Sequence, residues 1–323
     1  MSDNSTTAKH VERWAVRFSG IVQGVGFRPL VSVWAREYGL CGFVYNDGYG
    51  VYVEVQGLRE NLQNWLRDVR DLAPRLAHIN HVRQSLIPCQ TGEDGFIIAP
   101  SPTGSVVRTF LSAETAPCEE CLEEMHAPGR RYKYPFTNCT NCGPRYTIIE
   151  SIPYDRRRTS MSKFPMCSSC QEEYDTMEGR RYHAEPNACC ECGPSYRLVN
   201  TEGQEIVCQD VFEETRKRIA QGKIVALKGI GGYHLVCDAG NEEAVIRLRI
   251  RKERPDKPLA LMAGSLERAR QLVHINESEE ALLTHMARPI VLLDCLEGDE
   301  LENGSSSLAP SVAPHQHSLG IML

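Results

Sequence analysis

The sequence predicts an α+β protein of several domains, and three observations predict this class. Strand patterns alternate with amphipathic helix patterns over residues 11–99. Four Cys-x-x-Cys pairs then fall between residues 118 and 192, and mixed helix and strand patterns return over 203–323. A chain of 323 residues, 41% of them hydrophobic, is long enough to bury more than one core.

The N-terminus and the overall charge narrow the class further. No apolar run approaches the roughly 20 residues that cross a bilayer, and residues 1–5 lack the basic and apolar order of a signal peptide. We therefore expect a cytoplasmic protein with no membrane contact. A net charge of -6 argues against nucleic acid as the main partner.

Residues 11–99 alternate strands with two helices in the order β-α-β-β-α-β, which is the order of a ferredoxin-like fold. Apolar residues at helical or alternating spacing mark each element. The predicted elements are strand 12–18, helix 29–38, a turn at 46–48, strand 51–55, helix 58–72, and extended runs near Ile79 and Phe96.

A glycine-rich turn, Gly20-Ile-Val-Gln-Gly-Val-Gly-Phe-Arg28, lies between the first strand and the first helix. Glycines let successive backbone N–H groups converge on an anion, and the start of a helix adds its dipole. Arg28 adds a permanently charged guanidinium that can bind a phosphate in a bidentate manner. We predict a phosphate cradle here. The alternative is a tight turn with a surface arginine.

An internal repeat follows a linker at 100–117 that is rich in Ser, Thr, Pro and Gly. The copies span 118–149 and 167–198, and in each a Cys-x-x-Cys pair is separated from a second pair by 17 or 18 intervening residues. Both copies carry Gly-Arg-Arg-Tyr ten residues before the third cysteine, and both end in Cys-Gly-Pro-x-Tyr. The agreement indicates a duplicated metal-binding unit.

Two residues between cysteines let both thiolates face one ion, and two such turns complete a tetrahedral site. We therefore predict two closed, structural zinc sites that fold the segment and do not catalyse. The alternative is redox-active pairs, but thioredoxin-like pairs are not duplicated in this way. The ligand sets are Cys118, Cys121, Cys139 and Cys142, and Cys167, Cys170, Cys189 and Cys192.

Other residues near the repeat have simpler interpretations. His183 could replace a ligand, but a solvated or hydrogen-bonded histidine is the preferred interpretation, and Cys190 could be a spare thiol. Cysteines outside the pairs are expected to be small buried hydrophobes. These are Cys41, Cys89, Cys190, Cys208, Cys237 and Cys295.

The C-terminal part, 203–323, alternates helices and strands. The predicted elements are helix 210–220, strand 223–228, a Gly-Ile-Gly-Gly turn, helices near 241–252 and 278–286, and strands at 259–262 and 290–293. Cations gather at 247–257, where a helix gives way to a proline-bounded strand, and this suits a polyphosphate. A solvated basic helix face is the alternative. The Ser/Pro-rich residues 298–316 are expected to be mobile.

Two parts of the chain resemble known families. The glycine-rich turn resembles the acylphosphatase signature, and Asn46 falls where that family places its water-orienting asparagine. The resemblance implies a phosphoryl group held by the Arg28 side chain, with Asn46 positioning the attacking water. The backbone amides implied to help are those of Gln23, Gly24, Val25, Gly26, Phe27 and Arg28.

The run Lys252-Glu-Arg-Pro-Asp-Lys-Pro-Leu is similar to the YrdC-type domain. This implies binding of ATP, with Mg²⁺. The residues implied to contact its phosphates are Lys228, Lys252, Arg254 and Lys257.

The succession of these pieces over about residues 11–323 resembles the HypF family of carbamoyltransferases, which mature NiFe hydrogenases. The resemblance implies hydrolysis of carbamoyl phosphate to carbamate, activation with ATP as carbamoyl-adenylate, and delivery to the C-terminal cysteine of HypE. Members of that family continue well beyond this length. We therefore expect an incomplete YrdC-like domain and a chain that retains only the acylphosphatase step.

Two other functions stay open. One is a stand-alone acylphosphatase. The other is a nucleic-acid-binding module in which zinc ribbons present arginines and stacking tyrosines. Its arginines would be Arg130, Arg131, Arg156, Arg157, Arg158, Arg180 and Arg181, and its tyrosines Tyr132, Tyr134 and Tyr182.

Overall fold

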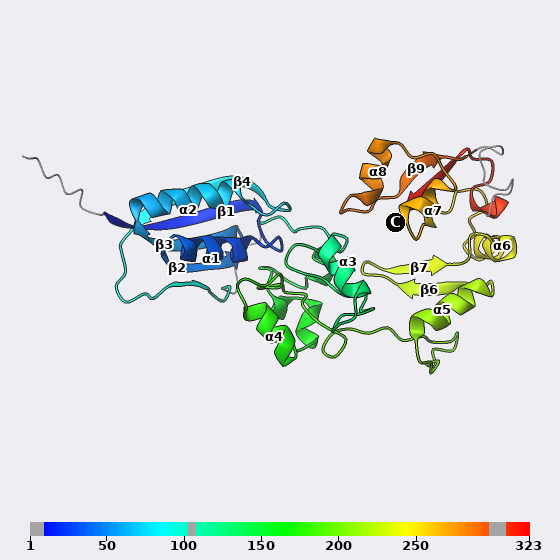
Figure 1. The fold of residues 1–323 in the computed structure, drawn as a ribbon, viewed down its shortest axis with the longest axis horizontal. Helices are drawn as coiled ribbons and strands as arrows, with labels where there is room; N and C mark the ends of the chain where they lie inside the picture. Colours follow the sequence, from blue (N-terminus) through cyan, green and yellow to red (C-terminus); the bar gives the residue numbers. More distant parts are fainter. Residues whose placement is uncertain (1–9, 103–107, 297–307) are drawn as a thin grey trace, which may run out of the picture. The chain divides into compact units, whose positions relative to one another are not determined.

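The computed structural model describes residues 10–102, 108–296 and 308–323. The chain divides into two compact units, Met1–Pro194 and Ser195–Leu323, drawn in sequence colours in Figure 1. Among the described residues, no helix has both the length and the apolar character that a bilayer crossing requires.

The first domain is a five-stranded sheet with two helices (Figure 1). The strand order is β4-β1-β3-β2-β5, antiparallel throughout except for the parallel pair β2 and β5. The predicted β-α-β-β-α-β order is confirmed, and β5 adds an edge strand. The elements are β1 (Val11–Ile21), α1 (Phe27–Glu37), β2 (Cys41–Asp47), β3 (Gly50–Leu58), α2 (Arg59–Asp71), β4 (His78–Ile87) and β5 (Phe96–Ile98).

Aromatic packing fixes where α1 begins. The Phe18 ring of β1 lies 5.1 Å from the Phe27 ring of α1 and 6.4 Å from the Trp65 ring of α2, centroid to centroid. Both helices therefore cover the same face of the sheet. Trp65 Nε1 also donates to the Val31 carbonyl at 3.3 Å, which joins the helices. All four residues are buried, so the turn that precedes α1 is anchored from the core.

The rest of the first unit holds little regular structure. Helices α3 (Glu119–His126) and α4 (Ser168–Asp175) begin directly after Cys118 and Cys167. One of the buried clusters in this region consists of cysteines alone. Such a segment needs a cross-link or a metal to fold. The 3₁₀ turns are η1 (Tyr146–Ile148), η2 (Arg156–Arg158) and η3 (Ser160–Lys163). Residues 103–107 of the predicted linker lie outside the described residues.

The second unit contains a three-stranded sheet of order β8-β10-β9 and a two-stranded ribbon of β6 and β7. Its core gathers apolar residues from helices and strands, including Val245, Leu283 and Ile321. The predicted helices are confirmed to within a few residues, whereas the strand expected at 259–262 is reduced to β8. The elements are α5 (Val211–Ala220), β6 (Val225–Lys228), β7 (Tyr233–Val236), α6 (Glu242–Arg251), β8 (Leu261–Met262), α7 (Leu266–Arg270), α8 (Glu277–Thr284), β9 (Val291–Asp294), η5 (Pro310–Val312) and β10 (Ser318–Met322).

One expectation is wrong in this unit. Residues 308–316 belong to the stretch expected to be mobile, yet Ala309 and Val312 are only 4% and 2% exposed. They pack into the apolar core at η5, together with Leu308 and Ala313 on either side. Residues 298–307 of the same stretch lie outside the described residues.

Candidate functional site

The glycine-rich turn has the backbone of an anion cradle. Gly24 and Gly26 take left-handed angles, with φ 71° and 76°, which glycine adopts without strain. Between and after them, Val25 and Phe27 are 0% and 1% exposed and hold the turn against the core. Among the described residues, no acceptor engages the N–H groups of Gly24, Val25 and Gly26. These groups are therefore free to bind an anion.

The two side chains predicted to be catalytic converge on one atom. Arg28 Nη2 donates to the carbonyl oxygen of Tyr154 at 3.0 Å, and Asn46 Nδ2 donates to the same oxygen at 2.9 Å. Arg28 is 7% exposed, so the alternative of a surface arginine is wrong. Asn46 Oδ1 is buried and has no partner among the described residues. An unpaired buried acceptor is rare, and here it could accept a hydrogen bond from a bound water.

Gln23 ties the cradle to the turn that follows Asn46. Its side-chain Nε2 donates to the carbonyls of Asp47 and Gly50, at 2.7 and 2.8 Å, and its Oε1 accepts from the Tyr154 N–H at 3.0 Å. The side chain thus links three segments that are distant in sequence. We infer a structural role for this side chain in addition to the predicted backbone role.

Sequence reasoning missed the carboxylates that hold Arg28. Asp155 Oδ1 accepts from Nη1 at 2.5 Å, and Glu185 Oε1 accepts from Nη2 at 2.8 Å. Burial alone would lower the pKa of Arg28, but the two carboxylates outweigh it, and the pKa is raised. Burial raises the pKa of Glu185, and Asp155 adds to this because one guanidinium cannot fully compensate two acids.

These contacts leave the guanidinium of Arg28 without a free edge for bidentate binding. A guanidinium can bind an anion in a bidentate manner through Nη1 and Nη2 or through Nε and Nη2, so both modes need Nη2. The two N–H groups of Nη2 are already engaged by Tyr154 and Glu185. A phosphate that binds Arg28 in a bidentate manner must therefore displace at least one of these partners. The structure describes the site in a closed form.

The remaining cavity agrees with a closed form. It measures about 20 Å³ and is lined by Gly24, Gly26, Arg28, Tyr154 and His183, among others. This volume is close to that of a single water. A larger hollow of about 510 Å³ lies beside Trp14 and Arg59 and contains none of the predicted site residues.

Arg145 is a further residue that sequence reasoning missed. Its Nε donates to the Gly24 carbonyl, and its terminal nitrogens donate to the carbonyls of Cys142 and Thr140 at 3.0 and 2.9 Å. These hydrogen bonds join the first cysteine repeat, the first finger (118–149), to the cradle. A signal was available, because the equivalent position of the second repeat holds Ser195 in an otherwise matching Cys-Gly-Pro-x-Tyr motif.

His183 lies beside the cradle and is not part of a cysteine cluster. Its Nδ1 is 3.1 Å from the Tyr174 hydroxyl, which confirms the hydrogen-bonded interpretation. Burial lowers the pKa of His183 to about 4, and the charge of Arg28 adds to this. The imidazole is therefore neutral at ordinary pH.

Each predicted set of four cysteines is brought together. The Sγ atoms of each set all lie within 4.8 Å of one another. Closest Sγ–Sγ distances are 3.6 and 3.7 Å in the first set and 3.6 and 3.8 Å in the second. A tetrahedral ion with Zn–S bonds of about 2.3 Å requires a separation of about 3.8 Å. The donor type and spacing therefore fit two zinc ions.

The expectation of buried hydrophobes is wrong for Cys89, Cys190 and Cys208, whereas Cys237 and Cys295 pack against the apolar core of the second unit. Cys89, Cys190 and Cys208 are exposed, and Cys41, Cys237 and Cys295 are only partly buried. Cys89 follows an outer strand of the sheet, and Cys208 precedes α5 in a loop, so neither position faces a core. Cys190 Sγ instead lies 3.5 Å from the Arg130 carbonyl oxygen.

Four of the ten residues proposed for nucleic-acid binding are buried. Arg131 and Arg181 are 1% and 6% exposed and form ion pairs with carboxylates of the same unit. Tyr134 and Tyr182 are also buried, whereas Tyr132 is exposed. Buried, paired arginines cannot contact a phosphate backbone, so the arrangement weighs against this function.

The four predicted nucleotide-binding residues lie in two places. Lys228 ends β6, with its ammonium 5.0 Å from the Tyr233 ring centroid. Lys252, Arg254 and Lys257 follow α6, and among the described residues no hydrogen bond or ion pair joins them to Lys228.

Arg249 is a missed residue that orders the loop after α6. It is 6% exposed, and its Nη1 donates to the carbonyls of Arg254, Pro255 and Lys257 at 2.9 to 3.1 Å. One buried guanidinium therefore shapes the loop that carries the predicted phosphate contacts.

Three family models match the chain in succession. The acylphosphatase model matches residues 14–98, and the HypF finger model matches 118–149 and 166–199. The model described as telomere recombination, which covers the Sua5, YciO and YrdC proteins, matches 217–323. The predicted fold class is thereby confirmed.

Individual relatives agree with these models. The carbamoyltransferase HypF2 of Cupriavidus necator is 46% identical over 313 residues, which cover 96% of this chain and 38% of that protein. An acylphosphatase of a Synechococcus strain is 43% identical over 86 residues, which cover 26% of this chain and 93% of that protein.

A crystal structure of full-length HypF in the phosphate- and nucleotide-bound form superposes with a TM-score of 0.88 at 40% identity. The match covers 98% of this chain and 40% of that one. The chain thus spans about two fifths of the length of the HypF proteins that it matches.

Proposed function

Because this chain belongs to the HypF family of carbamoyltransferases, we propose that its first domain hydrolyses carbamoyl phosphate to carbamate and phosphate. One observation carries the proposal. Arg28 and Asn46 meet beside a turn whose N–H groups are unengaged, and the Asn46 Oδ1 atom is left free to accept.

In the proposed step, Arg28 and the main-chain N–H groups of residues 23–28 hold the phosphoryl oxygens. Asn46 Oδ1 accepts a hydrogen bond from the attacking water. A bond forms between the water oxygen and phosphorus while the bridging P–O bond breaks, and carbamate leaves with the electron pair. Both water protons remain with the phosphate. Positioning and charge stabilisation are sufficient because carbamate is a good leaving group.

Substrate must open the site. We assign Tyr154, Asp155 and Glu185 to a cap that occupies Arg28 in the absence of substrate and withdraws when the phosphoryl group binds. The eight paired cysteines would hold two structural zinc ions, which fold the two repeats that flank Tyr154 and Asp155, the second of which contains Glu185. The zinc ions take no part in the hydrolytic step.

The later steps are proposed for the whole protein. Residues 217–323 match a YrdC-type model, and on this basis we assign ATP, with Mg²⁺, to Lys228, Lys252, Arg254 and Lys257. Carbamate would be activated there as carbamoyl-adenylate and then delivered to the C-terminal cysteine of HypE in hydrogenase maturation. We place these reactions in the cytoplasm.

Phosphate release from carbamoyl phosphate tests the first step. Arg28→Ala and Asn46→Ala should each lower kcat/KM at least about 100-fold, as loss of a principal charge-stabilising group does. The matched controls are Arg70→Ala, at an exposed position of α2, and Asn64→Ala, at a partly exposed position of the same helix, and both should retain full activity. Wild-type activity in either site variant would contradict the assignment.

A further inference from the structure

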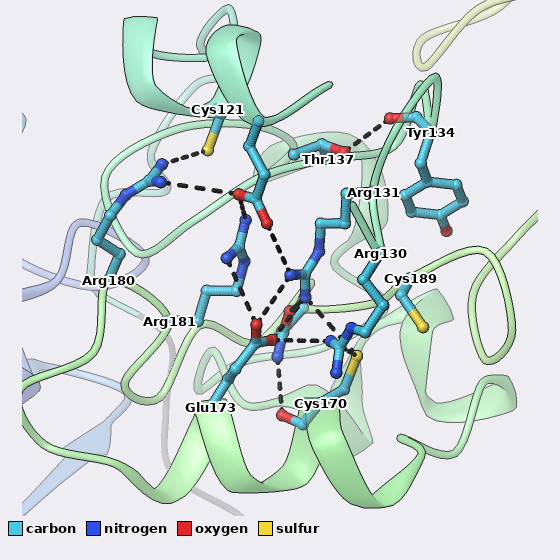
Figure 2. Close-up of polar contacts among 12 residues, drawn as sticks. Cys121, Arg130, Arg131, Tyr134, Thr137, Cys170, Glu173, Arg180, Arg181 and Cys189 are labelled. Atoms are coloured by element: carbon cyan, nitrogen blue, oxygen red, sulfur yellow. Dashed lines mark hydrogen bonds and ion pairs between the residues drawn. The ribbon is translucent and has the colours of Figure 1, made fainter. Parts of the chain in front are cut away.

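The repeated Gly-Arg-Arg-Tyr motif takes no part in the proposed reaction, yet both copies reach into the opposite finger. Arg130, in the first repeat, places Nη2 3.1 Å from Cys170 Sγ of the second. Arg180, in the second repeat, places Nη2 2.9 Å from Cys121 Sγ of the first. Figure 2 shows both contacts. The exchange is reciprocal, because each arginine contacts the second cysteine of the other repeat.

The second arginine of each motif also contacts the opposite repeat. Arg131 donates from Nε to the Ala188 carbonyl at 2.9 Å, directly before the ligand Cys189. Arg181 donates from Nε to the Asn138 carbonyl at 3.0 Å, directly before the ligand Cys139. Each guanidinium therefore also supports the third ligand turn of the opposite repeat.

Two carboxylates join these arginines into one network (Figure 2). Glu124 and Glu173 stand three residues after the second cysteine of each repeat. Arg131 is 3.0 Å from Glu124 and 2.6 Å from Glu173, and Arg181 is 2.5 Å from Glu124 and 3.7 Å from Glu173. Both arginines are buried, whereas the side chains of Glu124 and Glu173 are 29% and 32% exposed, so solvent and salt screen the network only in part.

The chemistry of the donor set gives these contacts a consequence. Four thiolates around a divalent ion carry a net charge of about -2, which N–H donors to sulfur stabilise. Such outer-shell groups orient and support the ligands, and their loss typically lowers metal affinity about 10- to 100-fold. Here the arginine side chains that donate to each site come from the opposite repeat. Disorder at one site therefore removes support from the other.

We propose that the two cysteine sites form one coupled metal-binding unit, in which each Gly-Arg-Arg-Tyr segment supports the zinc site of the opposite repeat. Zinc at either site strengthens binding at the other. The coupling is equal in both directions, as thermodynamic linkage requires.

Native mass spectrometry of the full chain during titration with a chelator tests the proposal. The wild type should pass from two zinc ions to none with little one-zinc species. Cys121→Ser, which disables the first site, should bind zinc at the second at least about 10-fold more weakly than the wild type. A dominant one-zinc species, or unchanged affinity at the second site, would overturn the coupling.

Zinc release into a chelating dye tests the arginines separately. Arg180→Ala should accelerate zinc release at least about 10-fold. Arg180→Lys should accelerate it less, because lysine keeps the positive charge but lacks the bidentate guanidinium. Arg197→Ala, at an exposed position five residues after the last ligand, Cys192, is the matched control. Circular dichroism before chelation verifies that each variant is folded. Zinc release from a folded Arg180→Ala protein at the rate of the wild type would contradict the proposed role of Arg180.

Discussion

At the scale of single residues, Arg28 determines whether the cradle can bind a phosphate. It is buried, and it is held by Asp155, Glu185 and the Tyr154 carbonyl. The carboxylates both stabilise the guanidinium and compete with any anionic ligand for its donors. The proposed hydrolysis thus depends on residues outside the first domain.

Neutralising either carboxylate should tighten phosphate binding, since it frees a donor of Arg28 and removes a repelling charge. We expect inorganic phosphate to bind Asp155→Asn and Glu185→Gln about 10-fold more tightly, or about 1.4 kcal/mol, by isothermal titration calorimetry. Asp71→Asn, at the exposed end of α2, is the control. Weaker binding in both folded variants would show that the carboxylates support the phosphate site and do not close it.

His183 should make stability depend on pH. Burial lowers its pKa to about 4 in the folded protein, while an unfolded histidine titrates near about 6.5. Between these values the unfolded chain binds more protons, so stability rises with pH from 4 to 6.5 and this contribution is constant above.

Urea unfolding in excess zinc at pH 5 and pH 7 measures this effect. The loss of stability on going to pH 5 should be smaller in His183→Gln than in the wild type. His126→Gln, at an exposed position, controls for the loss of a histidine. An unchanged loss in His183→Gln would contradict the assignment of this proton.

At the scale of elements, the turn between β1 and α1 must keep its left-handed glycines. A Cβ at Gly26 would lie 3.0 Å from Thr140 Cγ2, in the first finger. Gly92 has a similar φ, 82°, but nothing lies within 4 Å of the position of its Cβ. A comparison of alanine substitutions at Gly26 and Gly92 therefore distinguishes the effect of backbone strain from the effect of a displaced cradle.

Both Gly26→Ala and Gly92→Ala should lose about 1–2 kcal/mol of stability through left-handed strain. Gly26→Ala should in addition lower kcat/KM for carbamoyl phosphate, because the turn shifts away from the first finger. Thermal unfolding and phosphate release measure the two effects. Full activity in Gly26→Ala would show that the turn tolerates displacement.

Local pattern predicted the elements and missed the contacts between them. The spacing of Cys118 to Cys192 fixed both ligand sets, because each pair lies within one turn of chain. The partners of Arg28 lie 127 and 157 residues away, at Asp155 and Glu185, and no local periodicity reports such a contact. Helix 29–38 was predicted to within two residues of α1, and core packing places Val31 and Ala35 on its buried face.

At the scale of the whole molecule, the parts of the first unit differ in what holds them. The first domain has a large apolar core that includes Phe18, Val53 and Trp65. One buried cluster of the finger region is made of cysteines alone. Zinc should therefore fold the fingers without being required by the first domain.

Metal analysis should return two zinc ions per chain, as two four-thiolate sites require. Chelation followed by limited proteolysis should cut within 108–194 and leave a protected fragment over residues 11–99. Rapid loss of that fragment would show that the first domain depends on the metal.

A crystal structure of the full chain with bound phosphate tests the central claim most directly. Phosphate should lie on the N–H groups of residues 24–28 within hydrogen-bond distance of Arg28, with Asp155 or Glu185 released from the guanidinium. An empty cradle at saturating phosphate, with Arg28 still paired to both carboxylates, would contradict the account.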